Sequence, residues 1–180
     1  ALSISLGNEK NQTFASASST TAEGIIPNNE YQRYNFTVRN TSNFFNDRMT
    51  LDLGFSYVIQ KDQNMLSQGQ YFNPIVPLYL FPRGEDFTPY RMYERYDEGR
   101  QLMTQHWPYG EMGMAMQNPY WIINRNMFNN DRDRYMANAG LKYKVFDWMD
   151  ISGRVRIDNA NTRHTKKLYA STDAKFAQNK

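Results

Sequence analysis

Hydrophobic and polar residues alternate with a period of two along much of the chain. Successive side chains of a β-strand point to opposite faces, so this alternation predicts strands with one apolar face and one polar face. The clearest case is the segment 51–60, whose apolar positions are Leu51, Leu53, Phe55, Tyr57 and Ile59.

The same alternation recurs in five other segments. It is clear in residues 34–39, 135–145 and 151–157, and shorter and weaker in residues 2–6 and 13–20. We therefore predict an all-β fold of about six strands. The two strands nearest the C-terminus carry charges opposite their apolar positions, namely Lys142, Lys144, Arg154, Arg156 and Asp158.

These charged positions restrict what the sheet can face. The core of a soluble β-sandwich could not accept them, whereas a solvated outer face or the watery interior of a membrane barrel could. The apolar face then meets either a core or lipid. No run of about 18 apolar residues is present, so the sequence predicts no transmembrane helix.

The connections between the predicted strands alternate between short and long. Strict alternation of this kind is typical of outer-membrane barrels, which have short periplasmic turns and long extracellular loops. Four aromatic residues flank two of the short turns, as in an interfacial girdle: Phe44, Phe45, Phe146 and Trp148. The short connections are 7–11, 43–48 and 146–149, and the long ones are 22–30, 62–131 and the stretch after 161.

Residues 62–131 form a long insertion that does not alternate. Asn73-Pro74 and Asn118-Pro119 are turn or helix-start signals, and Thr88-Pro89 predicts a helix that continues to about Gln101. The insertion is dense in aromatic residues, most of which we expect to pack its own small core. The candidates for contact with a substrate or partner are Trp107, Tyr109, Tyr120 and Trp121.

Composition excludes several classes of function. The net charge of +3 comes from 21 basic and 18 acidic residues without a coherent basic face, so we expect no nucleic-acid partner. Cysteine is absent, and the two histidines, His106 and His164, lie far apart without ligand or triad spacing. Asp131-Arg132-Asp133 lacks the glycine and glutamate of a calcium loop. We predict no enzyme activity, no catalytic residue, no metal site and no cofactor.

Several short motifs, in their order and spacing, resemble the SusC/RagA family of TonB-dependent outer-membrane proteins of Bacteroidetes. The first group is Gly7-Asn8-Glu9-Lys10, Glu23-Gly24-Ile25-Ile26-Pro27-Asn28 and Gly69-Gln70-Tyr71-Phe72-Asn73-Pro74. The second is Pro77-Leu78-Tyr79-Leu80-Phe81-Pro82-Arg83-Gly84, Asn118-Pro119-Tyr120-Trp121, Asp131-Arg132-Asp133-Arg134-Tyr135 and Leu141-Lys142-Tyr143.

The resemblance implies a 22-stranded transmembrane barrel closed around an N-terminal plug. Such proteins import glycans, or peptides in some members, with energy passed through TonB, and they pair with a SusD-like surface lipoprotein. This chain would hold about six of the strands in the outer membrane, in contact with its lipid. The signal peptide, the TonB-contacting segment and the plug would belong to parts of a longer protein.

The expected organisation has four parts: barrel strands at 1–61, an extracellular insertion at 62–131, a strand pair at 132–161, and the start of the next extracellular loop at 162–180. The charged residues of the strand pair would then face the lumen, either lining a hydrated path or forming salt bridges within the barrel. The alternatives are a soluble all-β carbohydrate-binding module and a barrel of another class, such as a passive porin or an assembly factor.

Overall fold

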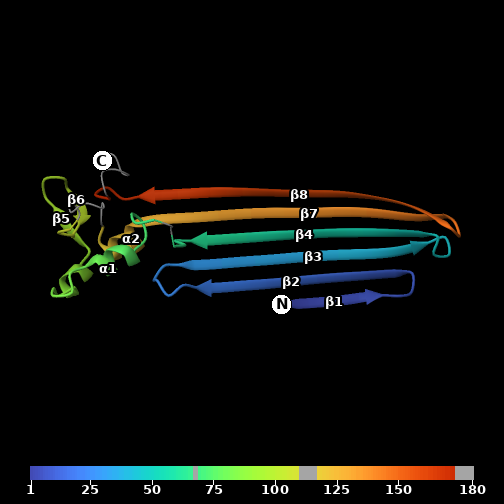
Figure 1. Cartoon of the computed structure of the whole chain (residues 1–180), viewed down its shortest axis with the longest axis horizontal. Helices are drawn as coiled ribbons and strands as arrows, with labels where there is room; N and C mark the ends of the chain where they lie inside the picture. The colour runs from blue at the N-terminus through green and yellow to red at the C-terminus, as the bar shows by residue number, and fades with distance from the viewer. Residues whose placement is uncertain (67–68, 110–116, 173–180) are drawn as a thin grey trace. The chain divides into compact units, whose positions relative to one another are not determined.

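The computed structural model describes residues 1–66, 69–109 and 117–172. Its main element is a six-stranded antiparallel sheet with the order β1-β2-β3-β4-β7-β8 (Figure 1). The strands are β1 (Leu2–Gly7), β2 (Asn11–Glu23), β3 (Glu30–Phe44), β4 (Met49–Gln63), β7 (Asn126–Phe146) and β8 (Met149–Leu168). The predicted all-β class and six strands are thus observed, in a sheet that is open rather than closed on itself.

The three short turns all lie at one end of the sheet (Figure 1). In the first, Asn8 Oδ1 accepts hydrogen bonds from the backbone N–H groups of Lys10 and Asn11, each 2.9 Å away. In the second, Phe45, Asn46 and Asp47 adopt positive φ values of 55°, 50° and 64°. The third consists only of the two residues between β7 and β8.

Strands β7 and β8 are longer than the sequence pattern predicts. β7 has 21 residues and begins at Asn126, not near 132, and β8 has 20 residues and continues to Leu168, beyond the predicted end near 161. A transmembrane strand needs about 9–11 residues. Each of these strands is therefore about twice as long as a membrane crossing requires.

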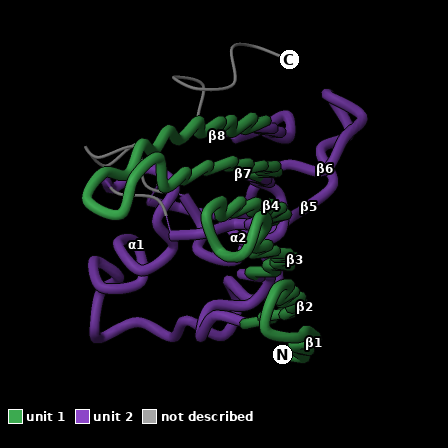
Figure 2. The backbone as a smooth tube through the Cα atoms, turned by 90° about the vertical axis from the view of Figure 1, so that its right-hand side faces the viewer, with its two compact units in different colours: residues 1–22, 31–61, 130–163 green, residues 23–30, 62–129, 164–180 purple. Residues whose placement is uncertain are grey.

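The chain divides into two compact units, shown in green and purple in Figure 2. Unit 1 comprises residues 1–22, 31–61 and 130–163 and contains most of the sheet. Unit 2 comprises residues 23–30, 62–129 and 164–180. Unit 2 includes residues 62–129 of the expected insertion 62–131 and residues 164–180 of the expected last segment 162–180, and residues 67–68, 110–116 and 173–180 lie outside the described chain.

Unit 2 contains the short elements of the insertion. These are α1 (Ile75–Leu80), the 3-10 helix η1 (Thr88–Arg91), β5 (Glu94–Asp97), β6 (Leu102–Gln105) and α2 (Pro119–Arg125). Both Asn-Pro signals are confirmed as helix starts: α1 follows Pro74, and Asn118 Oδ1 accepts a hydrogen bond from Tyr120 N at 2.8 Å.

The predicted helix from Thr88 to Gln101 is wrong. Only its first turn is helical, and the rest forms an antiparallel hairpin in which Glu94 is paired with Gln105 and Asp97 with Leu102. The hairpin turn has its own local support, because Asp97 Oδ1 accepts a hydrogen bond from Arg100 N at 3.1 Å and Gln101 adopts a φ of 53°. These interactions fix a turn at the point where a helix would have to continue.

The two units differ in their interiors. The buried hydrophobic residues of the described chain are Trp121 and Ile122, both in α2 of unit 2. Among the described residues of unit 1, by contrast, only Ser42 and Gly140 are buried. Unit 1 is therefore a sheet without a hydrophobic core of its own. No helix in the described residues is long and apolar enough to span a membrane.

Candidate functional surfaces

The apolar positions of four neighbouring strands form one continuous face of unit 1. They line a shallow depression of about 440 Å³ on β3, β4, β7 and β8. Phe55 is 49% exposed and Val155 is 66% exposed, so this face is open. We call it the apolar face. Its lining residues include Val38, Leu53, Phe55, Ala137, Ala139, Val155 and Ile157.

Polar side chains of β2 and β3 lie on this side of the sheet near the short turns. Towards the short turns, Asn40 Nδ2 donates to Asn11 Oδ1 at 2.9 Å and to Thr13 Oγ1 at 2.8 Å, and Ser42 Oγ donates to Asn40 Oδ1 at 2.7 Å. These side chains satisfy one another and lie on the same face as Val38. On β3 the apolar positions thus give way to polar ones towards the short turns, while on β4, β7 and β8 they continue through Leu51, Leu141 and Ile151.

The opposite face of unit 1 carries the charges that the sequence places there. Lys142 and Asp150 form an ion pair at 2.8 Å, and Arg134 and Asp158 form one at 2.5 Å. Lys144 pairs with Asp147, in the turn that follows, at 3.2 Å. We call this the polar face. These side chains are substantially exposed, so each pair contributes little to stability.

Arg154 and Arg156 belong to the same face by strand alternation. A Cβ added to Gly140 on β7 would lie 3.5 Å from Arg154 Nε, so Arg154 lies across the neighbouring strand. On β3 and β4 the same face carries hydroxyls as well as charges: Thr37 and Ser56 are hydrogen-bonded at 3.2 Å, and Thr41 Oγ1 donates to Asp52 Oδ1 at 2.8 Å. The structure thus brings the five predicted charged residues onto one solvated face, with three of them in ion pairs.

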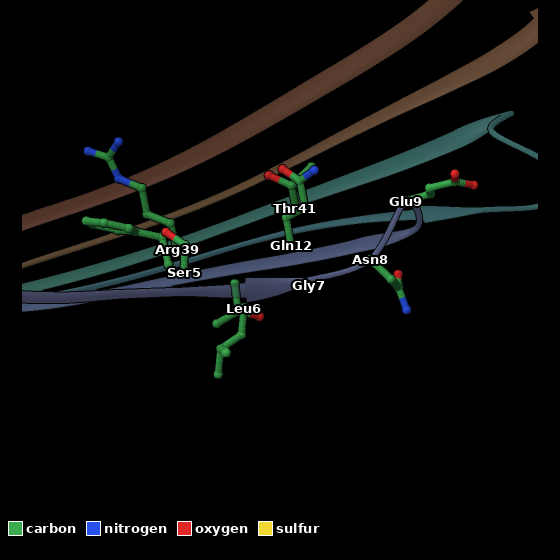
Figure 3. A pocket seen from close by; sticks show the side chains of 10 residues that line it. Ser5, Leu6, Gly7, Asn8, Glu9, Gln12, Arg39 and Thr41 are labelled. Carbon is green, nitrogen blue, oxygen red and sulfur yellow. The ribbon is translucent and has the colours of Figure 1, made fainter.

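A hollow of about 680 Å³ lies beside β1, β2 and β3. Figure 3 shows Arg39, Gln12 and Thr41 projecting from these strands on one side, while Leu6 points to the other. Phe14 also lines the hollow and is an aromatic side chain among polar ones. The sequence pattern did not single out Phe14, because alternation in residues 11–20 is obscured by Ser, Thr and Ala.

Three of the four aromatic residues predicted to contact a substrate or partner lie in one cluster of unit 2. Trp107 and Tyr109 have ring centroids 5.4 Å apart, and Phe87 lies 6.3 Å from Trp107 and 5.9 Å from Tyr120. Each of these rings is half-buried. Phe81, 4.9 Å from Phe87, completes what we call the aromatic cluster.

Tyr109 is held in the cluster by a hydrogen bond from its hydroxyl to the Glu85 carboxylate. This bond to Glu85, followed by desolvation and the negative charge of Glu85, raises the pKa of Tyr109 to about 12. The phenol therefore stays protonated well into alkaline solution. It presents a polar edge beside apolar rings, a combination suited to amphipathic ligands.

Trp121 does not belong to the exposed set, and this part of the prediction is corrected by the structure. Its ring is 0% exposed, and its Nε1 donates a hydrogen bond to Thr172 Oγ1 at 3.2 Å. The residue lies on the inner side of α2, where it provides the core of unit 2. A fully buried ring cannot stack on a sugar or a partner surface.

Unit 2 also contains an anchor centred on Arg125, which the sequence pattern did not indicate. Its guanidinium forms two hydrogen bonds of 2.7 Å with the carboxylate of Glu94 and lies 4.8 Å from the ring centroid of Tyr169. The bond to Glu94 raises the pKa of Arg125 above its usual value. These residues lie far apart in the chain, and no local spacing could have paired them.

No protein-family model matches the chain, and no curated protein matches it with significance. Within the described residues, no group of three or more His, Cys, Asp or Glu side chains is placed to hold a metal ion. The geometry of the two faces and of unit 2 therefore carries the functional argument.

Proposed function

We propose that this chain is part of the wall of an outer-membrane barrel, in a TonB-dependent nutrient importer of the SusC/RagA type. The observation that carries the proposal is the pairing of the open apolar face with the charged polar face on the same strands. Lipid would cover the first, and water enclosed by further strands would hydrate the second. The 22-strand closure and the link to TonB involve parts of the protein outside these 180 residues.

The arrangement of turns supports the same proposal. All three short turns leave one end of the sheet, where Phe146 and Trp148 stack with their ring centroids 5.5 Å apart. Trp148 is 80% exposed, which suits an aromatic anchor in the headgroup region better than a residue of a soluble protein. The short-turn end would then face the periplasm.

In this proposal the polar face is the lumen side. Lys142, Lys144 and Asp158 are paired with opposite charges, which balances their charge within the wall, while Arg154 and Arg156 would meet the plug or the solute. Unit 2 would be extracellular and would contribute to capture of an oligosaccharide or peptide or to docking of a SusD-like lipoprotein. The aromatic cluster supports this role because half-buried Trp and Tyr rings stack well on sugar rings.

A soluble carbohydrate-binding module is the competing hypothesis. It would share the aromatic cluster, but it would have to cover the apolar face with its own residues. In the described chain Leu53 and Phe55 are 44% and 49% exposed, which counts against that hypothesis.

Site-specific labelling would test the membrane placement. The 180 residues contain no cysteine, so single cysteines can be introduced in them and labelled with an environment-sensitive fluorophore. We expect labels at Phe55→Cys and Val155→Cys in vesicles to be quenched by lipids carrying a spin label. Matched labels at Ser56→Cys and Arg154→Cys should be quenched only by a water-soluble quencher. Protection of the first pair from both quenchers would indicate a covered protein core and contradict the proposal.

Ligand capture needs its own test. Isothermal titration of the intact protein with oligosaccharide mixtures and with peptide mixtures would show which class binds. Trp107→Ala and Tyr109→Ala should weaken binding, whereas Trp148→Ala, in the short turn between β7 and β8 of unit 1, should not. Equal binding by all three variants would remove the aromatic cluster from the capture site.

A further inference from the structure

The segment that follows β8, residues 169–172, is bound to the insertion at several points, and we call it the strap. Its first contact is Tyr169, whose ring centroid lies 4.8 Å from the Arg125 guanidinium and whose N–H donates to Arg125 O at 3.3 Å. Arg125 is in turn fixed by Glu94 on β5, with which it forms an ion pair of 2.6 Å. Tyr169 thus contacts the residue that ties α2 to the hairpin.

Thr172 makes the innermost contact of the strap. It is only 3% exposed, and its Oγ1 accepts from Trp121 Nε1 at 3.2 Å while donating to Asn126 Oδ1 at 3.0 Å. Trp121 and Asn126 are themselves 0% and 1% exposed. One hydroxyl therefore hydrogen-bonds with two buried side chains, at Trp121 Nε1 and Asn126 Oδ1.

Ser171 links the strap to the hairpin at some conformational cost. Its Oγ accepts a hydrogen bond from Gln105 N at 3.0 Å. Its backbone has a φ of 76°, in a region that side chains other than glycine adopt rarely and with strain. The contacts around Ser171 hold it in this conformation.

The kinds of contact determine how the strap can move. Tyr169 is 46% exposed and Ser171 only half-buried, so Thr172 is the one buried residue of the strap. A segment with so little buried apolar area belongs to the least stable part of a fold. If Thr172 alone withdrew, Trp121 Nε1 and Asn126 Oδ1 would be left buried and unpaired. A state in which only Thr172 has left its place is therefore disfavoured. The strap should therefore be either fully docked or fully released.

We infer that the strap is a latch that closes the insertion and opens as one piece, exposing Trp121 and Asn126. This inference goes beyond the proposed function and does not depend on it, because all the contacts lie within unit 2. In an importer the latch would connect the insertion 62–131 with the segment that follows β8. In a soluble module it would cover the same buried side chains, Trp121 and Asn126.

Hydrogen exchange with peptide-resolved mass spectrometry on the intact protein tests the latch. Tyr169→Leu removes the contact with the guanidinium, and Thr172→Val removes the hydroxyl while keeping the shape of the side chain. In the double variant we expect the amides of Gln105 and of α2 to exchange faster, by at least about threefold, with β1 and β2 unchanged. Lys167→Ala, an exposed change just before the strap, is the matched control and should exchange like the native protein.

A rescue variant separates release of the latch from general damage. Thr172→Ser keeps the hydroxyl and should restore native exchange in α2, even if Thr172→Val destabilises the whole protein. The inference fails if the double variant exchanges like the native protein. It also fails if Thr172→Ser behaves like Thr172→Val, or if Gln105 and α2 open with clearly different free energies in the native protein.

Discussion

Tyr57 on β4 donates a hydrogen bond from its hydroxyl to Asp133 Oδ1 on β7, 3.3 Å away. On β7 the apolar positions end at this contact, on the side away from the short turns. Tyr135 and Ala137 continue the apolar face in one direction along β7, and Asp131 follows in the other. A Tyr that spans this boundary, with its ring on apolar neighbours and its hydroxyl on a carboxylate, is typical of a membrane interface.

The first prediction concerns the cost of a charge on either side of this contact. Ala139→Arg places a cation within the apolar face and should destabilise the protein in lipid vesicles by about 2–4 kcal/mol. Asp131→Arg, beyond Tyr57 and Asp133, should cost only about 0–1 kcal/mol. Urea unfolding from vesicles measures both. Equal costs for the two substitutions would argue that the apolar face does not contact lipid.

The second prediction concerns the first short turn. A Cβ on Gly7 would lie 2.3 Å from Asn11 O and 2.8 Å from Gln12 Cα, both backbone atoms that cannot move independently. We expect Gly7→Ala to destabilise the pairing of β1 with β2 by about 1–3 kcal/mol through overpacking. Hydrogen exchange of β1 amides measures this change. Gly84→Ala, where a Cβ would meet nothing within 4 Å, is the control and should have little effect.

The third prediction concerns the Arg125 anchor. Arg125→Lys keeps the positive charge but loses the paired hydrogen bonds to Glu94, because an ammonium group cannot reproduce the planar geometry of a guanidinium. The side chains are 26% and 19% exposed, so the loss should reach about 1–2 kcal/mol. This loss of stability can be measured as faster amide hydrogen exchange in β5. The exposed neighbour Arg95→Lys should leave β5 unchanged, and a similar effect from both would show that the geometry of Arg125 is unimportant.

The fourth prediction concerns alkaline pH. The pKa of Tyr109 rises from 10.0 to about 12, chiefly because its hydroxyl donates to Glu85. A raised pKa in the folded state stabilises the fold fully below pH 10 and loses that contribution between about pH 10 and 12. Ultraviolet absorbance of the phenolate should therefore show Tyr109 titrating late. Glu85→Gln should bring its titration back towards the ordinary value, and an unchanged titration would contradict the assigned cause.

The strands could be predicted where the two faces differ in polarity and not beyond. Alternation is clear from Tyr135 to Val145, but before that point the outward positions Asp131 and Asp133 are polar like their neighbours. The backbone of β7 nevertheless remains extended from Asn126. Hydrogen bonding between strands maintains the conformation there, and a hydrophobic pattern cannot report it.

The insertion was harder to predict because long-range contacts override local preference. Thr88-Pro89 correctly marks a helical turn, but the following Glu and Arg residues suit a helix surface and a hairpin equally well. Glu94 is fixed by Arg125, and Gln105 Oε1 accepts from Asn118 N at 2.5 Å, so partners from α2 and its cap support the hairpin. Trp121 was misassigned for the same reason, since its burial depends on Thr172, more than forty residues away.

The absence of a hydrophobic core in unit 1 changes how substitutions there should be interpreted. Truncating Leu53 or Phe55 removes contact with the surroundings but leaves no void, whereas truncating Trp121 or Ile122 opens one inside unit 2. The penalty for the same shortening on the sheet will thus depend on the medium, being small in water and larger in hydrocarbon. For unit 1, about half of this chain, the free energy of folding therefore depends on the medium that surrounds the sheet.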